Sequence, residues 1–584
     1  MPARSEKAFA RLPPWATLST GTTSLWTDLP VALAGLALFY GLLSLARYWA
    51  APVTTRTEID LSPAALPRYA LFSVARIVVA YALSLAFSLA YGYAAAHSRQ
   101  AERLMIPLLD TLQSIPVLCF LPPVMISIVA LFPTKQFGLE LGSIILIFTG
   151  QVWNMAFSVY SSLKNIPREM LEAAQLYQLS RWQKFVQLEL PHAAIGLVWN
   201  SMMSVAGGWF ALMVCEMFVL GNRDLRLPGL GSYLQTASNA GQTRAIAWGV
   251  IAMVGVIVLI DQIVWRPVIA WSEKFKFEQV EATETPRSPV LDFLRRGRLF
   301  SRAAHALVAP AEEALALHFA RAHADPHPAP RPREFTKWAL RVLLVAALAG
   351  VLYATGEMAA LLARLSRTDL HEIFFGAGAT FLRVEFTLLL ASLWTVPVGV
   401  YVALKPRFAA LAQPVAQVAA SVPAPALFPI VLLVLIRAGG GLGVASIVLL
   451  LLGTQWYILF NVIAGASAIP AELKEVCEVF HLTRAQRWRK LLLPAIFPYL
   501  ITGLVTASGG AWNASIIAEY FRFRGQTFSI TGLGAVISRA TEAGNFAVIL
   551  AATMAISVMV VTINRLVWRR LYALASSRFK LEFT

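Results

Sequence analysis

Apolar residues along the chain gather into twelve long runs, separated by short polar segments. Six runs precede residue 270, at 29–46, 69–96, 105–132, 141–163, 193–220 and 246–265, and six follow residue 335, at 338–361, 376–403, 409–436, 442–464, 496–519 and 546–567. A helix of about 20 apolar residues crosses the hydrocarbon core of a bilayer. We therefore predict an all-α polytopic membrane protein with about 12 transmembrane helices.

The second set of runs is a copy of the first. WNSMMSVAGGWFALMVCEMF at 199–218 aligns with TGLVTASGGAWNASIIAEYF at 502–521, at a spacing of 303 residues that continues to the end of both halves. Upstream the spacing is 307 residues. The aligned pairs include Trp209 with Trp512, Glu216 with Glu519 and Arg76 with Arg383. Because six crossings return the chain to its starting side, we predict two parallel six-helix repeats about an axis along the membrane normal.

The runs and the segments between them divide the chain into five parts. They are a tail at 1–28, a first transmembrane domain at 29–270, a linker at 271–335, a second transmembrane domain at 336–575 and a tail at 576–584. The linker differs from its surroundings because it is rich in Arg, Pro, Glu and His. We expect the two tails and the linker to lie outside the membrane, all on the same side.

Composition excludes several classes of protein. The chain is 58% hydrophobic and 14% charged, with a net charge of +17, and in a membrane protein such an excess of Lys and Arg belongs to cytoplasmic loops rather than to nucleic-acid binding. No phosphate-binding loop of the form G-x-x-x-x-G-K-[ST] is present, and no catalytic triad or carboxylate pair is evident. The cysteines and linker histidines lack metal-ligand spacing, so we predict no metal, no cofactor and no catalysis in this chain.

The loop between the fourth and fifth runs of each half is the most informative segment. It is IPREMLEAAQLYQLSRWQKFVQLELP at 166–191 and IPAELKEVCEVFHLTRAQRWRKLLLP at 469–494. Both copies start with Ile-Pro, continue with an acidic helix and a turn, and end in a basic, aromatic stretch before Leu-x-Leu-Pro. Pro191 and Pro494 suit the first turn of the next helix, where a missing N–H has no cost.

This pattern resembles the EAA loop of binding-protein-dependent ABC importer permeases. The matching positions are Glu172, Ala173, Ala174 and Pro191 in the first copy and Glu475, Val476, Cys477 and Pro494 in the second. Gln178 and His481 stand where the family has glycine. The resemblance implies that the loops dock into two copies of a separate ATPase subunit, which binds ATP and Mg, and that a periplasmic or lipid-anchored binding protein delivers the solute. The alternative is an ordinary amphipathic helix at the membrane surface.

The resemblance also implies a bacterial inner-membrane location with both termini in the cytoplasm. The basic residues agree, because they lie in the N-terminal tail, near Arg99, in 164–190 and in the linker. Within the superfamily, AEYF at 518–521 and TGLG at 531–534 are similar to nitrate, sulfonate, taurine and bicarbonate permeases. We therefore expect an importer of a small anion that works by alternating access.

Polar residues inside the apolar runs are candidates for a translocation path, because hydrocarbon makes them costly. The candidates are Gln151, Trp153, Asn154, Trp209, Gln455, Trp456, Asn461 and Trp512. For the amides, an equally favoured alternative to lining a path is hydrogen bonding that only holds the helices together. Glu216 and Glu519 either serve an outer gate or cap the Gly-Leu-Gly turn that follows. For Arg76 and Arg383 we expect side chains that extend to the membrane interface.

Two further functions stay open at this stage. An ion-coupled secondary transporter is also built from six-helix repeats, but it needs an acid near the membrane midplane, where we find only amides. A non-transporting membrane scaffold is the other.

Arginine is in excess on the predicted outer face. These arginines would attract an anion or contact lipid phosphate. They are Arg47, Arg56, Arg223, Arg226, Arg522 and Arg524, against the acids Glu58, Asp60 and Asp224.

Overall fold

A computed structural model describes residues 58–132, 136–220, 223–272, 275, 334–439, 441–523 and 526–578. The tail at 1–28, the apolar run at 29–46 and nearly all of the linker lie outside the described residues. So do Arg47, Arg56 and Arg524.

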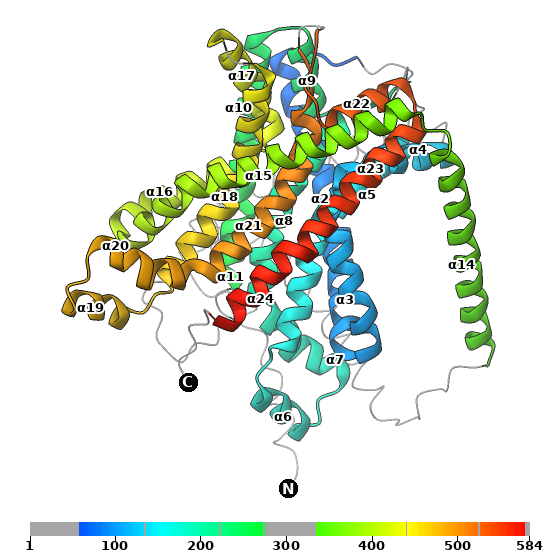
Figure 1. Ribbon diagram of the computed structural model, residues 1–584. Helices are drawn as coiled ribbons and strands as arrows, with labels where there is room; N and C mark the ends of the chain where they lie inside the picture. Colours follow the sequence, from blue (N-terminus) through cyan, green and yellow to red (C-terminus); the bar gives the residue numbers. More distant parts are fainter. Residues whose placement is uncertain are drawn as a thin grey trace, which may run out of the picture. The chain divides into compact units, whose positions relative to one another are not determined.

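The described chain is almost entirely helical (Figure 1). The first half contains η1 (Pro63–Ala65), α2 (Leu66–His97), α3 (Arg99–Ser114), η2 (Val117–Phe120), α4 (Leu121–Leu131), α5 (Gln136–Lys164), α6 (Arg168–Leu176), α7 (Arg181–Lys184), η3 (Phe185–Glu189), α8 (Leu190–Glu216), β1 (Val219–Leu220), β2 (Arg223–Asp224), α9 (Leu230–Asn239), α10 (Thr243–Ile260), η4 (Asp261–Trp265) and α11 (Arg266–Ser272).

The described part of the second half starts with the long helix α14 and then repeats this order. It contains α14 (Glu334–Leu362), α15 (Arg367–Leu404), α16 (Pro406–Ser421), α17 (Ala424–Arg437), α18 (Leu442–Ser467), α19 (Ala471–Val479), α20 (Arg484–Arg487), η6 (Trp488–Leu492), α21 (Leu493–Ala518), β3 (Tyr520–Phe523), β4 (Gln526–Ser529), α22 (Leu533–Ala543), α23 (Phe546–Ile563), η7 (Asn564–Trp568) and α24 (Arg569–Arg578). The strands pair as antiparallel hairpins, β1 with β2 and β3 with β4.

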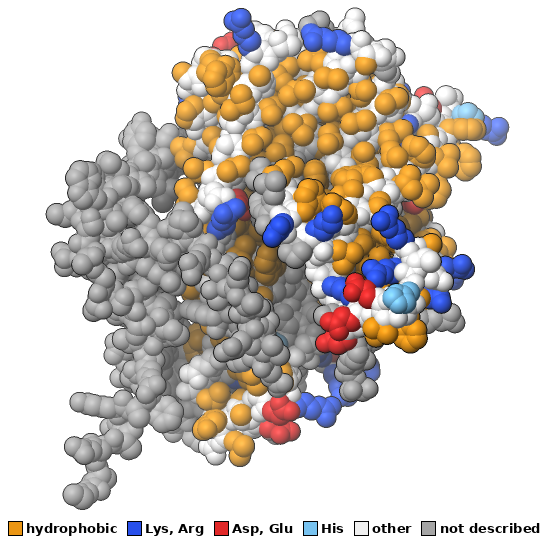
Figure 2. Space-filling view, turned by 90° about the vertical axis from the view of Figure 1, so that its left-hand side faces the viewer, with side chains coloured by type: hydrophobic (Ala, Val, Ile, Leu, Met, Phe, Trp, Pro, Cys, Tyr) orange, Lys and Arg blue, Asp and Glu red, His pale blue; other side chains and the backbone are white. Residues whose placement is uncertain are grey.

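Eight helices of the described chain are long and apolar enough to cross a membrane. They are Pro63–His97, Gln136–Lys164, Arg181–Glu216, Thr243–Ser272, Arg367–Leu404, Leu442–Ser467, Arg484–Ala518 and Phe546–Ala575. Hydrophobic side chains cover a broad stretch of the surface in Figure 2, and Lys and Arg side chains gather along its border. These features confirm the prediction of an all-α polytopic membrane protein.

The runs at 105–132 and 409–436 are not continuous helices. The first breaks between α3 and α4 at Ile115, and the second breaks between α16 and α17 at Val422. Both residues have extended backbone, with ψ of 128° and 119°. The cause is the following proline, Pro116 or Pro423, because its ring excludes the helical conformation from the preceding residue. The third element of each half is therefore a broken helix rather than a single span.

The helices that follow the two EAA-like loops start earlier than the prolines predict. Ser180 and Thr483 cap them, each in a reciprocal capping box with the glutamine three residues later. Before Pro191 and Pro494 the helix passes through a π turn, η3 or η6. The wider turn accommodates a residue that lacks an N–H donor. Each proline thus lies inside one continuous helix, at 181–216 or 484–518.

Contacts within the chain define two compact units. Of the described residues, those at 161–200, 259–275 and 334–348 belong to the first unit, and those at 58–160, 201–258 and 349–578 belong to the second. In the second unit α18 packs along α15 and α21. Both repeats contribute to this unit, and they meet where the backbone N–H of Leu118 in η2 donates to Asn513 Oδ1 of α21 over 3.5 Å.

Candidate functional site

The first EAA-like loop is a helix, a tight turn and the start of α7. Ala174 is buried and Glu172 is exposed, so the small residue faces the protein and the acid faces outward. Gln178 has φ of 50°, in the left-handed region, and the N–H of Leu179 donates to the carbonyl of Ala174 over 3.0 Å. This is the usual helix-ending motif for which glycine is favoured.

The second loop, in the other compact unit, has the same geometry. Cys477 is buried and Glu475 is exposed. His481 has φ of 48°, and the N–H of Leu482 donates to the carbonyl of Cys477 over 3.0 Å. The two loops therefore share one turn, with a glutamine and a histidine in the left-handed position that favours glycine.

Each loop also exposes a pair of large apolar side chains that sequence reasoning missed. Leu176 and Tyr177 end α6 with 83% and 76% of their surfaces exposed, and Val479 and Phe480 end α19 with 74% and 72% exposed. The pairs lie 303 residues apart, at equivalent positions. In each loop the apolar pair follows an exposed glutamate by four residues, and such an exposed combination is suited to contact with another protein. Their recurrence in both copies was the signal in the sequence.

The candidates for the translocation path fall into two groups. Gln151, Trp209, Gln455 and Trp512 are buried, and Gln151 lies so close to Gly208 that a Cβ there would be 2.3 Å from its amide nitrogen. Such burial favours a packing role for these four residues. Trp153, Asn154, Trp456 and Asn461 are only partly buried.

The hydrogen bonds of the two amides in the partly buried group are different. Asn154 accepts a hydrogen bond from Gln113 over 3.2 Å, which joins α5 to α3. Asn461 donates to the carbonyl of Tyr457 in its own helix over 2.8 Å. Trp456 packs beside the cluster formed by Val402, Ala416, Leu459 and Ile463.

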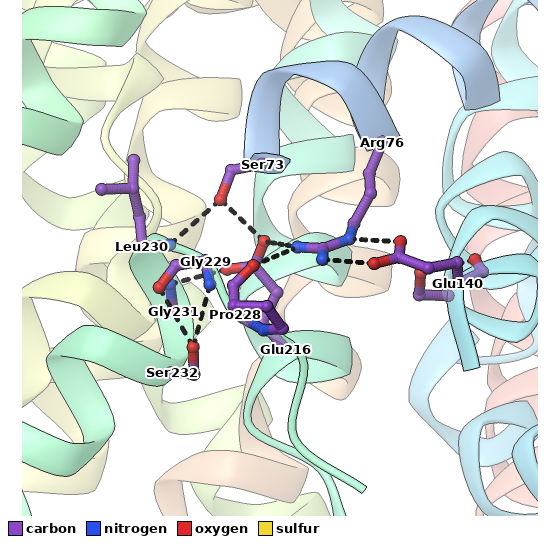
Figure 3. Close-up of polar contacts among 10 residues, drawn as sticks. Ser73, Arg76, Glu140, Glu216, Pro228, Gly229, Leu230, Gly231 and Ser232 are labelled. Carbon is purple, nitrogen blue, oxygen red and sulfur yellow. Dashed lines mark hydrogen bonds and ion pairs between the residues drawn. The ribbon is translucent and has the colours of Figure 1, made fainter. Parts of the chain in front are cut away.

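A buried network of charges holds the Gly-Leu-Gly turn of the first half (Figure 3). Arg76 of α2 lies between two carboxylates, donating to Glu140 over 2.6 Å and to Glu216 over 2.7 Å. All three side chains have no solvent exposure. The expectation that Arg76 reaches the membrane interface is therefore wrong, because two acids from α5 and α8 pair with it inside the protein.

Glu216 connects this network to the turn. Its Oε1 also accepts from Ser73 over 2.7 Å, and its Oε2 accepts from the N–H of Gly231 over 2.7 Å. The N–H of Gly231 belongs to the first turn of α9, where an anion is favoured. A Cβ at Gly229 would lie 2.2 Å from the Glu216 carboxyl carbon, so only glycine allows this approach.

The second half repeats the network with one acid fewer. Thr380 donates to Glu519 over 2.7 Å, Arg383 forms an ion pair with the same carboxylate, and the N–H of Gly534 donates to its Oε2 over 2.7 Å. Gly443 occupies the position that aligns with Glu140. Arg383 is 13% exposed, whereas Arg76 is fully buried. In both halves the glutamate binds the turn, as the capping alternative predicts.

Two features of the buried charged residues were missing from the sequence analysis. One is the link from Arg76 and Arg383 to the glutamates; both charges recur in both halves, a pattern that marks functional or structural pairs within membranes. The other is Glu385 of α15, whose buried Oε1 has no hydrogen-bond partner in the described structure. Among the described residues no group of three or more His, Cys, Asp or Glu side chains could hold a metal ion.

Replacing Arg76 should destabilise the protein strongly. Arg76→Met leaves Glu140 and Glu216 buried without their counter-charge, and loss of one partner from a buried ion pair costs about 3–5 kcal/mol. Thermal unfolding in detergent should show a large fall in the midpoint, whereas Arg68→Met, at an exposed position of the same helix, should leave it unchanged. Equal midpoints for both variants would contradict the structural role of the network.

Glycine in the loop turns should stabilise the protein. Gln178→Gly and His481→Gly each remove the steric cost of a left-handed residue, about 1 kcal/mol, against a smaller entropic loss. The midpoint of thermal unfolding should rise in each variant. Gln175→Gly, within α6 itself, is the control and should lower it by the helix-propensity cost of about 1 kcal/mol. A fall in the midpoint for the turn variants would contradict the strain assigned to them.

Comparison with known proteins agrees with this geometry. Residues 82–264 and 395–580 each match the family "binding-protein-dependent transport system inner membrane component". The chain is 28% identical over 204 residues to the nitrate import permease protein NrtB of Leptolyngbya laminosa, which covers 35% of this chain and 69% of that protein.

Two other relatives are similar over comparable stretches. The bicarbonate transport system permease protein CmpB of Synechococcus elongatus is 29% identical over 147 residues, or 25% of this chain and 51% of that protein. The carnitine transport permease protein OpuCD of Listeria monocytogenes is 29% identical over 183 residues, or 31% of this chain and 77% of that protein. The chain belongs to the family of binding-protein-dependent transport system inner membrane components, with two family domains in one polypeptide, and is the permease component of an ABC importer.

Proposed function

We propose that this chain supplies both membrane halves of an importer that takes up a small anion, with two copies of a separate ATPase docked on its two EAA-like loops. The observation that carries the proposal is the pair of matching loops, each with an exposed glutamate beside two exposed apolar residues. Two copies of one ATPase need two equivalent docking surfaces, and this chain has two. ATP and Mg would be bound by that subunit, and the chain itself would hold no cofactor.

The proposed location is the inner membrane of a bacterium, with the loops and both termini in the cytoplasm. Support comes from the basic residues of the loops and the linker, since cytoplasmic segments carry the excess of Lys and Arg. A periplasmic or lipid-anchored binding protein would then deliver the solute to the opposite ends of α8 and α21.

The proposed substrate class follows from two arguments. The names of two relatives state nitrate and bicarbonate, both small oxyanions, although the third states carnitine. Arg226 and Arg522 lie near the ends of α8 and α21 that are remote from the loops, where they would attract an anion. For the path through the membrane we propose the partly buried residues Trp153, Asn154, Trp456 and Asn461, at the centre of α5 and α18.

Charge reversal in both loops should uncouple transport from ATP hydrolysis. In the variant Glu172→Lys with Glu475→Lys, the solute-stimulated ATPase activity of the reconstituted complex should fall to its basal level, because both docking surfaces then carry the wrong charge. The permease should still insert and unfold at the wild-type temperature, because both side chains are exposed. Glu58→Lys, another exposed acid outside the loops, should leave coupling unchanged, and normal coupling in the double variant would overturn the docking assignment.

Uptake by proteoliposomes should distinguish an ATP-driven anion importer from an ion-coupled transporter. We expect accumulation of labelled nitrate, bicarbonate or a small sulfonate that requires ATP, persists with a proton ionophore and is unchanged in Glu385→Gln. The glutamine variant removes the carboxylate of Glu385, which lies within the helix at 367–404 and has a buried oxygen without a hydrogen-bond partner in the described structure. ATP-independent uptake that Glu385→Gln abolishes would favour the secondary transporter, and uptake of a cation would refute the substrate class.

A further inference from the structure

The two buried charge networks differ at one position, and the difference leaves an arginine with an unused donor. In the first repeat Glu140 binds Arg76 through both oxygens, at 2.6 Å from Nε and at 2.6 Å from Nη2 (Figure 3). In the second repeat Gly443 occupies the aligned position. Arg76 is fully buried, whereas Arg383 is 13% exposed. The second repeat thus keeps the arginine and lacks the carboxylate that binds it in the first.

The structure supports the alignment of Glu140 with Gly443. In both repeats the position follows a Gly-Leu pair and lies at the start of the helix, α5 or α18. The hydroxyl of Ser143 donates to the carbonyl of Glu140 over 2.8 Å, and the hydroxyl of Ser446 donates to the carbonyl of Gly443 over 2.7 Å. The backbone is therefore arranged alike at the two positions, and only the side chain differs.

Arg76 holds its other acceptors in a way that leaves two donors for a carboxylate. Its Nη1 alone donates to Glu216 over 2.7 Å and to the carbonyl of Pro228 over 3.0 Å. Nε and Nη2 then form a planar fork that matches the two oxygens of Glu140. One guanidinium in this fold therefore binds two oxyanion groups at once.

Arg383 meets the equivalent acceptors with two nitrogens instead of one. Its Nη1 pairs with Glu519, and its Nη2 donates to the carbonyl of Thr531 over 3.1 Å. Its Nε has no hydrogen-bond acceptor among the described residues. Because Arg76 serves both acceptors with Nη1, a rotation of the Arg383 guanidinium would release Nη2 as well. Arg383 can then present the same fork to an anion.

The space beside this fork is accessible and has no acid of its own. A Cβ built on Gly443 would meet no other part of the chain within 4 Å, and both Gly443 and Val444 are exposed. No Asp or Glu occurs between Glu385 and Glu472 in the sequence, so α16, α17 and α18 bring no carboxylate to Arg383. Glu385 follows Arg383 by two residues and therefore lies on another side of α15.

The start of α18 adds a second attraction for an anion. Gly441 caps this helix without a side-chain acceptor, and the N–H groups of a first helical turn favour negative charge. At 1.5 Å per residue the stretch from Gly443 to Ser467 extends about 36 Å before the second EAA-like loop. This length exceeds the hydrocarbon core, so Gly443 lies on the membrane face opposite the loops.

We propose that Arg383 and the start of α18 bind an oxyanion group, a phosphate or a carboxylate, in the place that the Glu140 carboxylate takes in the first repeat. There the carboxylate links α5 to α2, and the bound group would link α18 to α15 in the same way. Leu382, Phe386 and Leu389 of α15 are 68%, 53% and 68% exposed. The acyl chains of an anionic phospholipid can pack on them while its phosphate binds Arg383, and a free anion offers the same oxygens.

The test measures thermal unfolding of the whole purified chain in neutral detergent. One sample receives phosphatidylglycerol without inorganic phosphate, with phosphatidylcholine as its blank. Another receives inorganic phosphate without anionic lipid, with chloride at equal ionic strength as its blank. At least one addition should raise the wild-type midpoint by about 2 °C or more, because a ligand of the folded state stabilises it. A rise with lipid alone identifies the headgroup as the ligand, a rise with phosphate alone identifies the free ion, and a rise with both shows that either source reaches Arg383.

The variant Gly443→Glu supplies the carboxylate from the chain itself. Its midpoint without additions should exceed that of the wild type, and neither addition should raise it further, because its own carboxylate then occupies the fork of Arg383. Val444→Glu is the matched control. It adds the same charge to an exposed position of the same turn, about 100° further around the helix, and should keep the wild-type response.

A second variant tests the arginine directly. Arg383→Lys keeps the charge that pairs with Glu519 but lacks the planar fork, so it should lose most of the response to the additions. Absence of a rise in the wild type, or an undiminished rise in Gly443→Glu or Arg383→Lys, would overturn the proposal. Loss of the response in Val444→Glu would also overturn it, because the effect would then follow charge at this end of α18 rather than Arg383.

Discussion

The contact between one glutamate and one glycine-rich turn organises each half of this permease. Glu216 and Glu519 lie at the ends of the long helices α8 and α21, and each accepts a hydrogen bond from the second N–H of the helix that follows the turn. An arginine from α2 or α15 supplies the counter-charge. Such a carboxylate could not remain charged inside a membrane protein alone, since the cost of desolvation requires both a paired cation and hydrogen bonds. The long helices, the turn and the second helix are therefore fixed together.

The two halves have the same arrangement but differ in the number of buried acids that pair with the arginine. Arg76 binds two buried acids, whereas Arg383 binds one and retains some exposure, because glycine occupies the position aligned with Glu140. The same inequality recurs in the equivalent helices α9 and α22, because Asn239 of α9 has a buried oxygen without a hydrogen-bond partner whereas Glu542 of α22 forms an ion pair with Arg522. Fusion of the halves in one chain guarantees that unequal halves always pair with each other.

Continuous helices join the loops to these networks. In each half one helix begins at a capped residue after the loop, passes a π turn before a proline, and ends at the glutamate that binds the turn. A helix of this length moves as a rod, since its backbone hydrogen bonds resist bending except at such irregular turns. A displacement of a loop would therefore be passed along its helix toward the glutamate at the other end.

The sequence alone determined the class of fold, the duplication and the loops. Long apolar runs have a single stable solution in a bilayer, and the spacing of 303 residues made the matching loops visible without coordinates. It also showed every charge of the networks, in Arg76, Glu216 and their counterparts. What it could not show was distance: Arg76 and Glu140 are 64 residues apart in sequence and 2.6 Å apart in the structure. Side-chain pairing across helices depends on their rotation and depth.

The tertiary structure also decided matters that a linear pattern leaves ambiguous. It broke the third apolar run of each half at Ile115 and Val422, where a proline outweighs hydrophobicity. It separated buried Trp209 and Trp512 from partly buried Trp153 and Trp456, although all four occupy apolar runs. It brought residues of both repeats together around a cavity of about 500 Å³, which Phe218 and Phe521 both line. Hydrophobic periodicity reports that a residue avoids water, but whether it meets lipid, another helix or a cavity is set by the packing of the whole chain.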